Sequence, residues 1–136
     1  MPERAYVDAN VVLRLLVGNP PDMAARAHAL FERMERGELE LVLDVIALAE
    51  CVWTLQSFYK RTPAVIAPTM RELLLLPNLE VPERGLLLEA LTLYEERGVD
   101  FVDALLAARL HSDGSDKIHS FDRHFDRLPE IQRLDP

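Results

Sequence analysis

The sequence predicts an α/β domain with a mostly parallel sheet that is covered by helices on both faces. Short apolar runs that are typical of strands alternate with longer runs that have helical spacing. Proline, glycine and asparagine separate these runs. The length of 136 residues and the hydrophobic content of 49% suit one hydrophobic core. We therefore expect a single domain over residues 1–136.

The helices are predicted from apolar residues that recur at spacings of three and four. The first is expected over residues 10–17, where Gly18 ends it, and the second from Pro21 or Asp22 to the residue before Gly37. Further helices are expected over residues 45–59, 63–76, 82–97 and 100–110. Strands are expected over residues 4–7, 40–43, 78–81, 117–121 and 130–134.

The apolar stretch from Val45 to Tyr59 contains one charged residue, Glu50. Its spacing places Glu50 on one helix face with Ile46 and Trp53. An ionised carboxylate that is buried without a partner costs several kcal/mol, so a base, a proton or a cation would have to stabilise it. The alternative is that Glu50 faces solvent from a half-buried helix.

Three more carboxylates lie at the ends of apolar elements, namely Asp8, Asp103 and Asp122. Ligands of parallel α/β sheets bind beyond the carboxyl ends of the strands, where Asp8 and Asp122 are expected. Carboxylate oxygens are the ligands that hard divalent cations prefer. These acids and Glu50 therefore indicate the walls of a divalent-metal site.

Each of these aspartates also has a purely structural interpretation. Asp8 and Asp122 both suit the N-cap of a following helix. Asp100 suits the N-cap of the helix that contains Asp103. Asp103 is expected to begin that helix's buried stripe, and the alanines in Ala104–Ala108 would let the helix approach the sheet closely.

Other chemistries are disfavoured by composition and motif. Cys51 is the only cysteine, so an intrachain disulfide and a cysteine-based zinc cluster are excluded. The four histidines, His28, His111, His119 and His124, lack metal-ligand spacing and are interpreted as surface or structural residues. Phosphate-binding glycine loops and the GxSxG elbow are absent from the sequence.

The net charge and the hydropathy pattern limit the classes of partner that we expect for this protein. The formal charge of −8 opposes long-range attraction to nucleic acid, although about two divalent cations would offset the four site carboxylates. No run approaches the ~18 uncharged apolar residues of a membrane helix, and the first residues lack a secretory signal. We expect a cytoplasmic protein without membrane contact.

Four segments in order, YVDANVVLRLL, LAECVWTL, GVDFVDALLAARL and SFDRHF, resemble the PIN-domain nuclease family, in particular the VapC-type toxins of prokaryotic toxin–antitoxin pairs. The resemblance implies a three-layer α/β/α domain that cleaves RNA phosphodiesters at a Mg²⁺ or Mn²⁺ site. It implies that the site acids are Asp8, Glu50, Asp103 and Asp122, with Asn10 and Ser120 as supporting polar residues. It also implies an RNA substrate, a cognate antitoxin that blocks the site, and a homodimer formed through helical surfaces.

Two other functions remain open from the residues themselves. One is a catalytically silent PIN-like binding module, and the other is a metal-dependent phosphatase-type hydrolase that acts on small phosphates. The residue types do not separate the general base from the metal ligands, since any of the four acids suits both roles. Arg14, Lys60 and Arg61 are candidates for contacts to the RNA backbone, with solvated surface as the alternative for each.

Overall fold

The structure is a mixed α/β fold with parallel strands, as the sequence predicts. It is a computed structural model that describes residues 2–136. In chain order the elements are β1 (Glu3–Tyr6), α1 (Ala9–Val17), α2 (Pro21–Glu35), β2 (Leu39–Val42), α3 (Val45–Ser57), α4 (Pro63–Leu74), β3 (Leu79–Glu80), α5 (Arg84–Arg97), α6 (Phe101–Ser112), β4 (Lys117–His119), the 3-10 helix η1 (Arg123–Arg127) and β5 (Gln132–Leu134). Each expected helix and strand is present, with small shifts at its ends.

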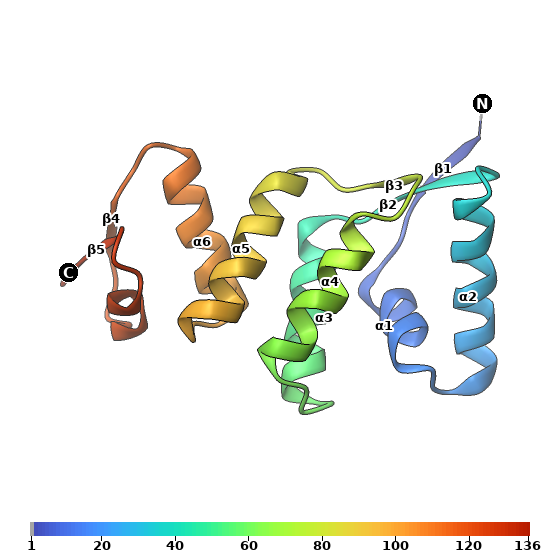
Figure 1. Ribbon diagram of the computed structural model, residues 1–136, viewed down its shortest axis with the longest axis horizontal. Coiled ribbons are helices and arrows are strands. Elements are labelled where there is room, and N and C mark those ends of the chain that lie inside the picture. Colours follow the sequence, from blue (N-terminus) through green and yellow to red (C-terminus); the bar gives the residue numbers. More distant parts are fainter. Residues whose placement is uncertain (1) are drawn as a thin grey trace.

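The strands form two parallel sheets. The first has the order β1-β2-β3, with Tyr6 opposite Val42 and Val42 opposite Glu80. The second pairs β4 with β5, with Ile118 opposite Arg133. Helix pairs connect β1 to β2 and β2 to β3, because parallel neighbours require a crossover connection. Figure 1 shows the two sheets toward opposite ends of the molecule, with α5 and α6 between them.

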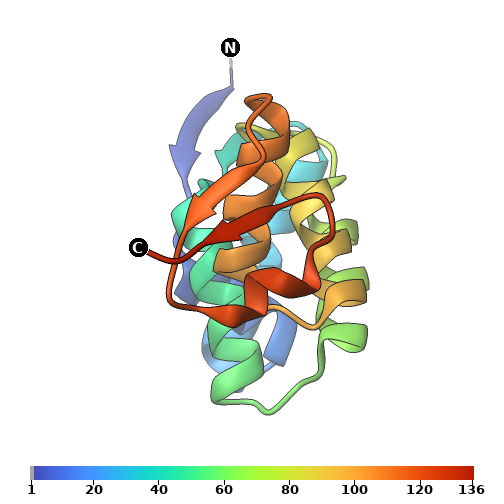
Figure 2. The same cartoon turned by 90° about the vertical axis from the view of Figure 1, so that its left-hand side faces the viewer.

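Parallel pairing is thus confirmed, and the division into two sheets is a feature that the sequence pattern does not show. β4 and β5 are three residues long each, and each carries one half-buried apolar side chain, Ile118 and Leu134 respectively. Strands this short have little hydrophobic pattern from which a neighbour can be inferred. Figure 2 shows β4, η1 and β5 in front of α6.

The core lies between the helices and the first sheet. Leu41, Leu43, Leu48 and Leu91 are essentially inaccessible to solvent. Tyr94 is buried as well, and its hydroxyl donates to Oε1 of Gln56 at 2.6 Å, which links α5 to α3. A buried tyrosine hydroxyl without such an acceptor would be costly, so this hydrogen bond helps to fix the two helices relative to each other.

The alanines of α6 pack in a different place from the one expected. Ala104, Ala107 and Ala108 are buried, as small residues at a close helix contact should be. Their helix, however, packs along α5 rather than on the sheet, as Figure 1 shows. The expectation that these alanines bring α6 close to the sheet is therefore wrong. Small side chains permit the close approach of a helix to a sheet or to another helix. In this fold the main neighbour of α6 is the helix α5.

Among residues 2–136 the structure contains no helix that is long and apolar enough to cross a membrane.

Candidate functional site

Asp8 follows β1 and caps α1. One of its carboxylate oxygens accepts from the backbone N–H of Val11 at 3.1 Å, and its backbone is extended, as an N-cap requires. The strand-like pairing continues to the residue before it, since Val7 N–H donates to the carbonyl of Val42. The predicted position of Asp8 at the end of a strand is confirmed, and the carboxylate itself is exposed. Asn10 is exposed in the first turn of α1.

Glu50 lies on the solvent face of α3. The buried face of this helix carries Leu48, Cys51, Val52 and Leu55. Ile46 and Trp53, which share a face with Glu50, are 69% and 68% exposed. The expectation of a buried Glu50 is therefore wrong, and its solvent-facing alternative is correct. A helix that is apolar on every side does not reveal which side faces the core, and this is the physical reason for the error.

Asp8 and Glu50 act on a common neighbour, the thiol of Cys51. Burial, together with the smaller effects of the negative charges of Glu50 and Asp8, raises the pKa of Cys51 to about 12. The Cys51 thiol also approaches the carbonyl of Ala9 at 3.6 Å, which joins α3 to the start of α1. These contacts place Asp8 and Glu50 around one junction of the fold.

Asp103 lies in the first turn of α6, and Asp100 caps that helix. Oδ1 of Asp100 accepts from the backbone N–H of Asp103 at 2.8 Å, which confirms the predicted capping pair. The buried face of the helix consists of Phe101, Ala104, Ala107 and Ala108, whereas Leu106 is 40% exposed. Asp103, which was expected to begin the buried stripe, is therefore only half-buried at its edge.

The Asp103 carboxylate is poorly solvated. Its Oδ2 atom is buried and has no hydrogen-bond partner. Burial, chiefly, and the negative charges of Asp100 and Asp122 together raise the pKa of Asp103 to about 6. A buried acceptor without a donor is unfavourable in a folded protein unless a proton or a cation satisfies it.

Asp122 is held in the turn between β4 and η1. Its Oδ1 accepts from the backbone N–H of His124 at 2.8 Å and also lies 3.1 Å from Nδ1 of His124. The Asp122 N–H donates to Oγ of Ser120 at 2.9 Å, and Arg133 donates to the Ser120 carbonyl at 2.9 Å. Ser120 therefore fixes the turn that presents Asp122.

Asp103, Asp122 and His124 together form a candidate cation site. One ligand atom from each residue lies within 4.8 Å of the others, and no other such group of three occurs among residues 2–136. The donor set fits a divalent cation, because two carboxylates and an imidazole are all protein ligands of such ions and one Asp103 oxygen lacks any other partner. We call these three residues the Asp103 group.

His124 is the member of the Asp103 group that the sequence interpretation did not include among the site residues. The sequence favours a surface or structural role for it, because no histidine pair has metal-ligand spacing. The available signal was its place two residues after Asp122, within the turn SFDRHF. A side chain at that spacing in a capped turn can bend back onto the carboxylate of the cap.

The four predicted acids do not all meet in one group of ligand atoms. Asp103 and Asp122 belong to the Asp103 group, whereas Asp8 and Glu50 lie outside it. A cavity of about 200 Å³ lies between α3 and α6, and its lining includes Ala49 next to Glu50 and Val102 next to Asp103. In the described part of the chain, none of the four acids forms an ion pair with arginine or lysine.

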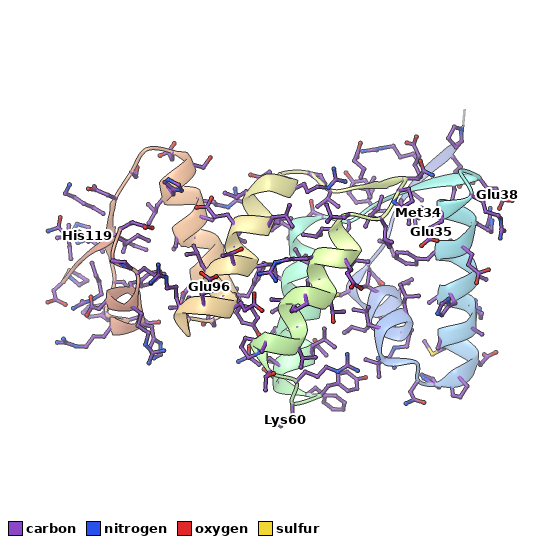
Figure 3. All side chains as sticks on the ribbon, in the orientation of Figure 1. Met34, Glu35, Glu38, Lys60, Glu96 and His119 are labelled. Carbon is purple, nitrogen blue, oxygen red and sulfur yellow. The ribbon has the colours of Figure 1, made fainter. Side chains whose placement is uncertain are left out.

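The basic residues considered for RNA contacts differ in their surroundings. Arg14 is half-buried and donates to the carbonyl of Asn19 and to the hydroxyl of Tyr59, so it is a structural residue rather than solvated surface. Lys60 is exposed in the turn after α3, where Figure 3 labels it, and Arg61 is half-buried beside it.

Fold and site together define an α/β protein with acidic side chains at the ends of parallel strands and a candidate centre for a divalent cation. Comparison with protein families matches residues 5–131 to the PIN domain, and the chain belongs to this family. PIN domains are typically metal-dependent nucleases, and they generally use divalent metal ions. Comparison with curated proteins gave no match.

Proposed function

We propose that this protein is a Mg²⁺- or Mn²⁺-dependent endoribonuclease that acts in the cytoplasm as the toxin of a toxin–antitoxin pair. The PIN domain supports nuclease chemistry in general. The observation that carries the proposal is the Asp103 group, in which a buried oxygen of Asp103 lacks a donor beside a second carboxylate. Four acids without arginine or lysine partners favour a cation site over a structural network of ion pairs.

The proposed roles follow from how each carboxylate is fixed. Asp103 and Asp122 hold the cation. The Asp122 carboxylate is positioned by the hydrogen bond that it accepts from the His124 N–H, and the backbone of Asp103 is fixed by its N–H, which donates to Asp100. When bound, a divalent cation neutralises charge on a phosphate and makes a coordinated water more acidic. Asp8 and Glu50 complete the acid set near the substrate, and any of the four carboxylates is chemically able to accept the proton of the attacking water. In-line attack at phosphorus then depends on positioning of the water and the phosphate.

Cleavage of defined RNAs with and without chelator tests the chemistry. We expect cleavage in Mg²⁺ or Mn²⁺, none in chelator, and a loss of at least about a hundredfold in Asp103→Asn, because a preorganised electrostatic group is worth that much in rate. Asp22→Asn, which removes an exposed carboxylate from α2, is the matched control and should keep wild-type activity. Cleavage that persists fully in Asp103→Asn would contradict the assignment.

The same assay separates the other functions. A phosphatase-type hydrolase would release phosphate from small esters in the same metal and leave RNA intact. A silent PIN-like module would bind RNA without cleaving it under any metal. Either result would replace the nuclease proposal.

We further propose a cognate antitoxin and a homodimer as protein partners. Support comes from apolar side chains left in solvent on two neighbouring helices, Ile46 and Trp53 of α3 and Val102 of α6, each more than 60% exposed. Exposed apolar groups that gather on one surface are typical of interaction sites.

Trp53 provides a direct measurement of association, because it is the only tryptophan. Exposed indole emits at long wavelength, so burial in an interface should shift its emission to shorter wavelength. We expect a blue shift as protein concentration rises, in step with a larger mass in sedimentation velocity. Trp53 emission that stays at long wavelength while a dimer forms would exclude α3 from the interface.

A further inference from the structure

The cation site contains a nitrogen donor that an all-carboxylate site would lack. Nδ1 of His124 lies 3.1 Å from Oδ1 of Asp122, and the imidazole belongs to the Asp103 group, whose ligand atoms lie within 4.8 Å of one another. We propose that His124 is the third protein ligand of this site and that its imidazole makes the site select first-row transition ions over Mg²⁺.

The geometry around Asp122 supports ligation. Oδ1 of Asp122 already accepts from the His124 N–H and lies beside its Nδ1. Beside this pair, the buried Oδ2 of Asp103 has no hydrogen-bond partner and remains for a cation. The His124 and Asp122 side chains are 57% and 42% exposed, so an ion can reach the site from solvent without opening the core.

The choice of ion follows from the donor set. Mg²⁺ is a hard cation that prefers oxygen ligands and keeps several waters, so an imidazole adds little to its binding. Imidazole binds zinc and other first-row ions well, and mixed sites follow the order in which Zn²⁺ exceeds Mn²⁺. The site should therefore bind Zn²⁺ most tightly, then Mn²⁺, then Mg²⁺. Mn²⁺ is the useful probe because it is paramagnetic.

The competing interpretation is that His124 only braces the turn through its hydrogen bond to Asp122. The substitution His124→Asn separates the two roles. The asparagine amide places an N–H donor near the position of Nδ1, so the bracing contact is kept while the imidazole ligand is lost. His119→Asn is the matched control, because His119 is an exposed histidine of β4, in the same region of the molecule, and lies outside the Asp103 group (Figure 3).

The experiment uses the whole protein with Mn²⁺ alone, at fixed pH and without RNA. Electron spin echo modulation of the bound ion should show a coupled ¹⁴N nucleus in the wild type and in His119→Asn, and no such coupling in His124→Asn. Calorimetry should show Mn²⁺ affinity reduced about tenfold or more in His124→Asn, with a much smaller change for Mg²⁺. Labelling with ¹⁵N-histidine should alter the wild-type signal, which tests ligation even if the variant is unstable.

Absence of nitrogen coupling in the wild type, or its persistence in His124→Asn, would overturn the inference. Equal losses of Mn²⁺ and Mg²⁺ affinity would also overturn it, because they would indicate a bracing role. The inference rests on the proposed function for its biological meaning. Different results, however, would refute the nuclease proposal and the role of His124. Nitrogen coupling without RNA cleavage would refute the nuclease, whereas metal-dependent cleavage without nitrogen coupling would refute only the role of His124.

Discussion

At the scale of single residues, the fold uses the same type of side chain for structure and for chemistry. Asp8 and Asp122 each cap a helix with one carboxylate oxygen. Capping fixes the rotamer of the side chain without consuming its second oxygen. The structural and functional interpretations of these aspartates are therefore compatible. The local sequence suggests a helix cap or a site residue at each position. It does not show that one aspartate can serve both roles at once.

Asp103 allows a prediction of pH dependence. Its pKa is raised from an ordinary value of 3.8 to about 6, chiefly by burial, so the folded protein binds a proton between these pH values that the unfolded chain does not bind. The free energy of unfolding must therefore fall as pH rises through this window, and the loss is complete above pH 6.

Asp103→Asn removes this loss because asparagine does not ionise. In chelator at pH 7.5 we expect the variant to melt about 2–5 °C above the wild type. This shift corresponds to a gain of roughly 1 kcal/mol in the free energy of unfolding, once solvent screening of the partly exposed carboxylate is taken into account. The difference should shrink toward zero below about pH 4, where both forms of the site are neutral. Circular dichroism melts across this range measure it, with Asp22→Asn as the control. A stability gain that is independent of pH would show that ionisation of Asp103 is not its cause.

At the scale of elements, sequence periodicity locates helices better than it identifies their buried faces. Helix α6 begins and ends close to where spacing and the Asp100 cap predict. Its buried stripe is nevertheless shifted from the expected one, and the buried face of α3 differs from the expected face. Both helices are rich in alanine, leucine and valine on several sides, so the core-facing side depends on neighbours that are distant in sequence. Tertiary packing decides such cases.

The N-cap of α6 can be tested as an element. Asp100→Ala leaves the backbone N–H of Asp103 without its acceptor, and should lower the free energy of unfolding by about 1 kcal/mol. Asp100→Asn keeps an acceptor oxygen at this position and should lose only a small part of that. Urea unfolding of the three proteins measures the difference. If alanine and asparagine are equally destabilising, the charge of Asp100 matters more than its hydrogen bond.

At the scale of the whole molecule, the sequence indicated which acids to examine but not how they are distributed. Asp8 and Asp122 were both predicted beyond the ends of strands, and both lie there. The prediction that they share one site assumed one sheet, whereas β1 and β4 belong to different sheets. The pairing of such short strands depends on how α5 and α6 pack. The three residues of β4 alone do not indicate which strand is their partner.

This separation leads to a prediction that compares Asp8→Asn with Asp103→Asn. Without RNA, Asp103→Asn should weaken Mn²⁺ binding about tenfold or more, because it removes a member of the Asp103 group. Asp8→Asn should leave the Mn²⁺ affinity within about twofold of wild type, since sites without shared partners behave independently. Both variants should nevertheless lose RNA cleavage, because the proposed chemistry requires all four acids.

Calorimetry with Mn²⁺ and the RNA assay on the same preparations measure this contrast. Asp22→Asn should leave both readouts unchanged. If Asp8→Asn weakens Mn²⁺ binding as strongly as Asp103→Asn does, all four acids hold the ion together in solution. Asp8 then belongs to the ion site together with the Asp103 group. If only the Asp103 group controls ion binding, Asp8 and Glu50 contribute instead to the RNA-bound state, in which they act near the scissile phosphate.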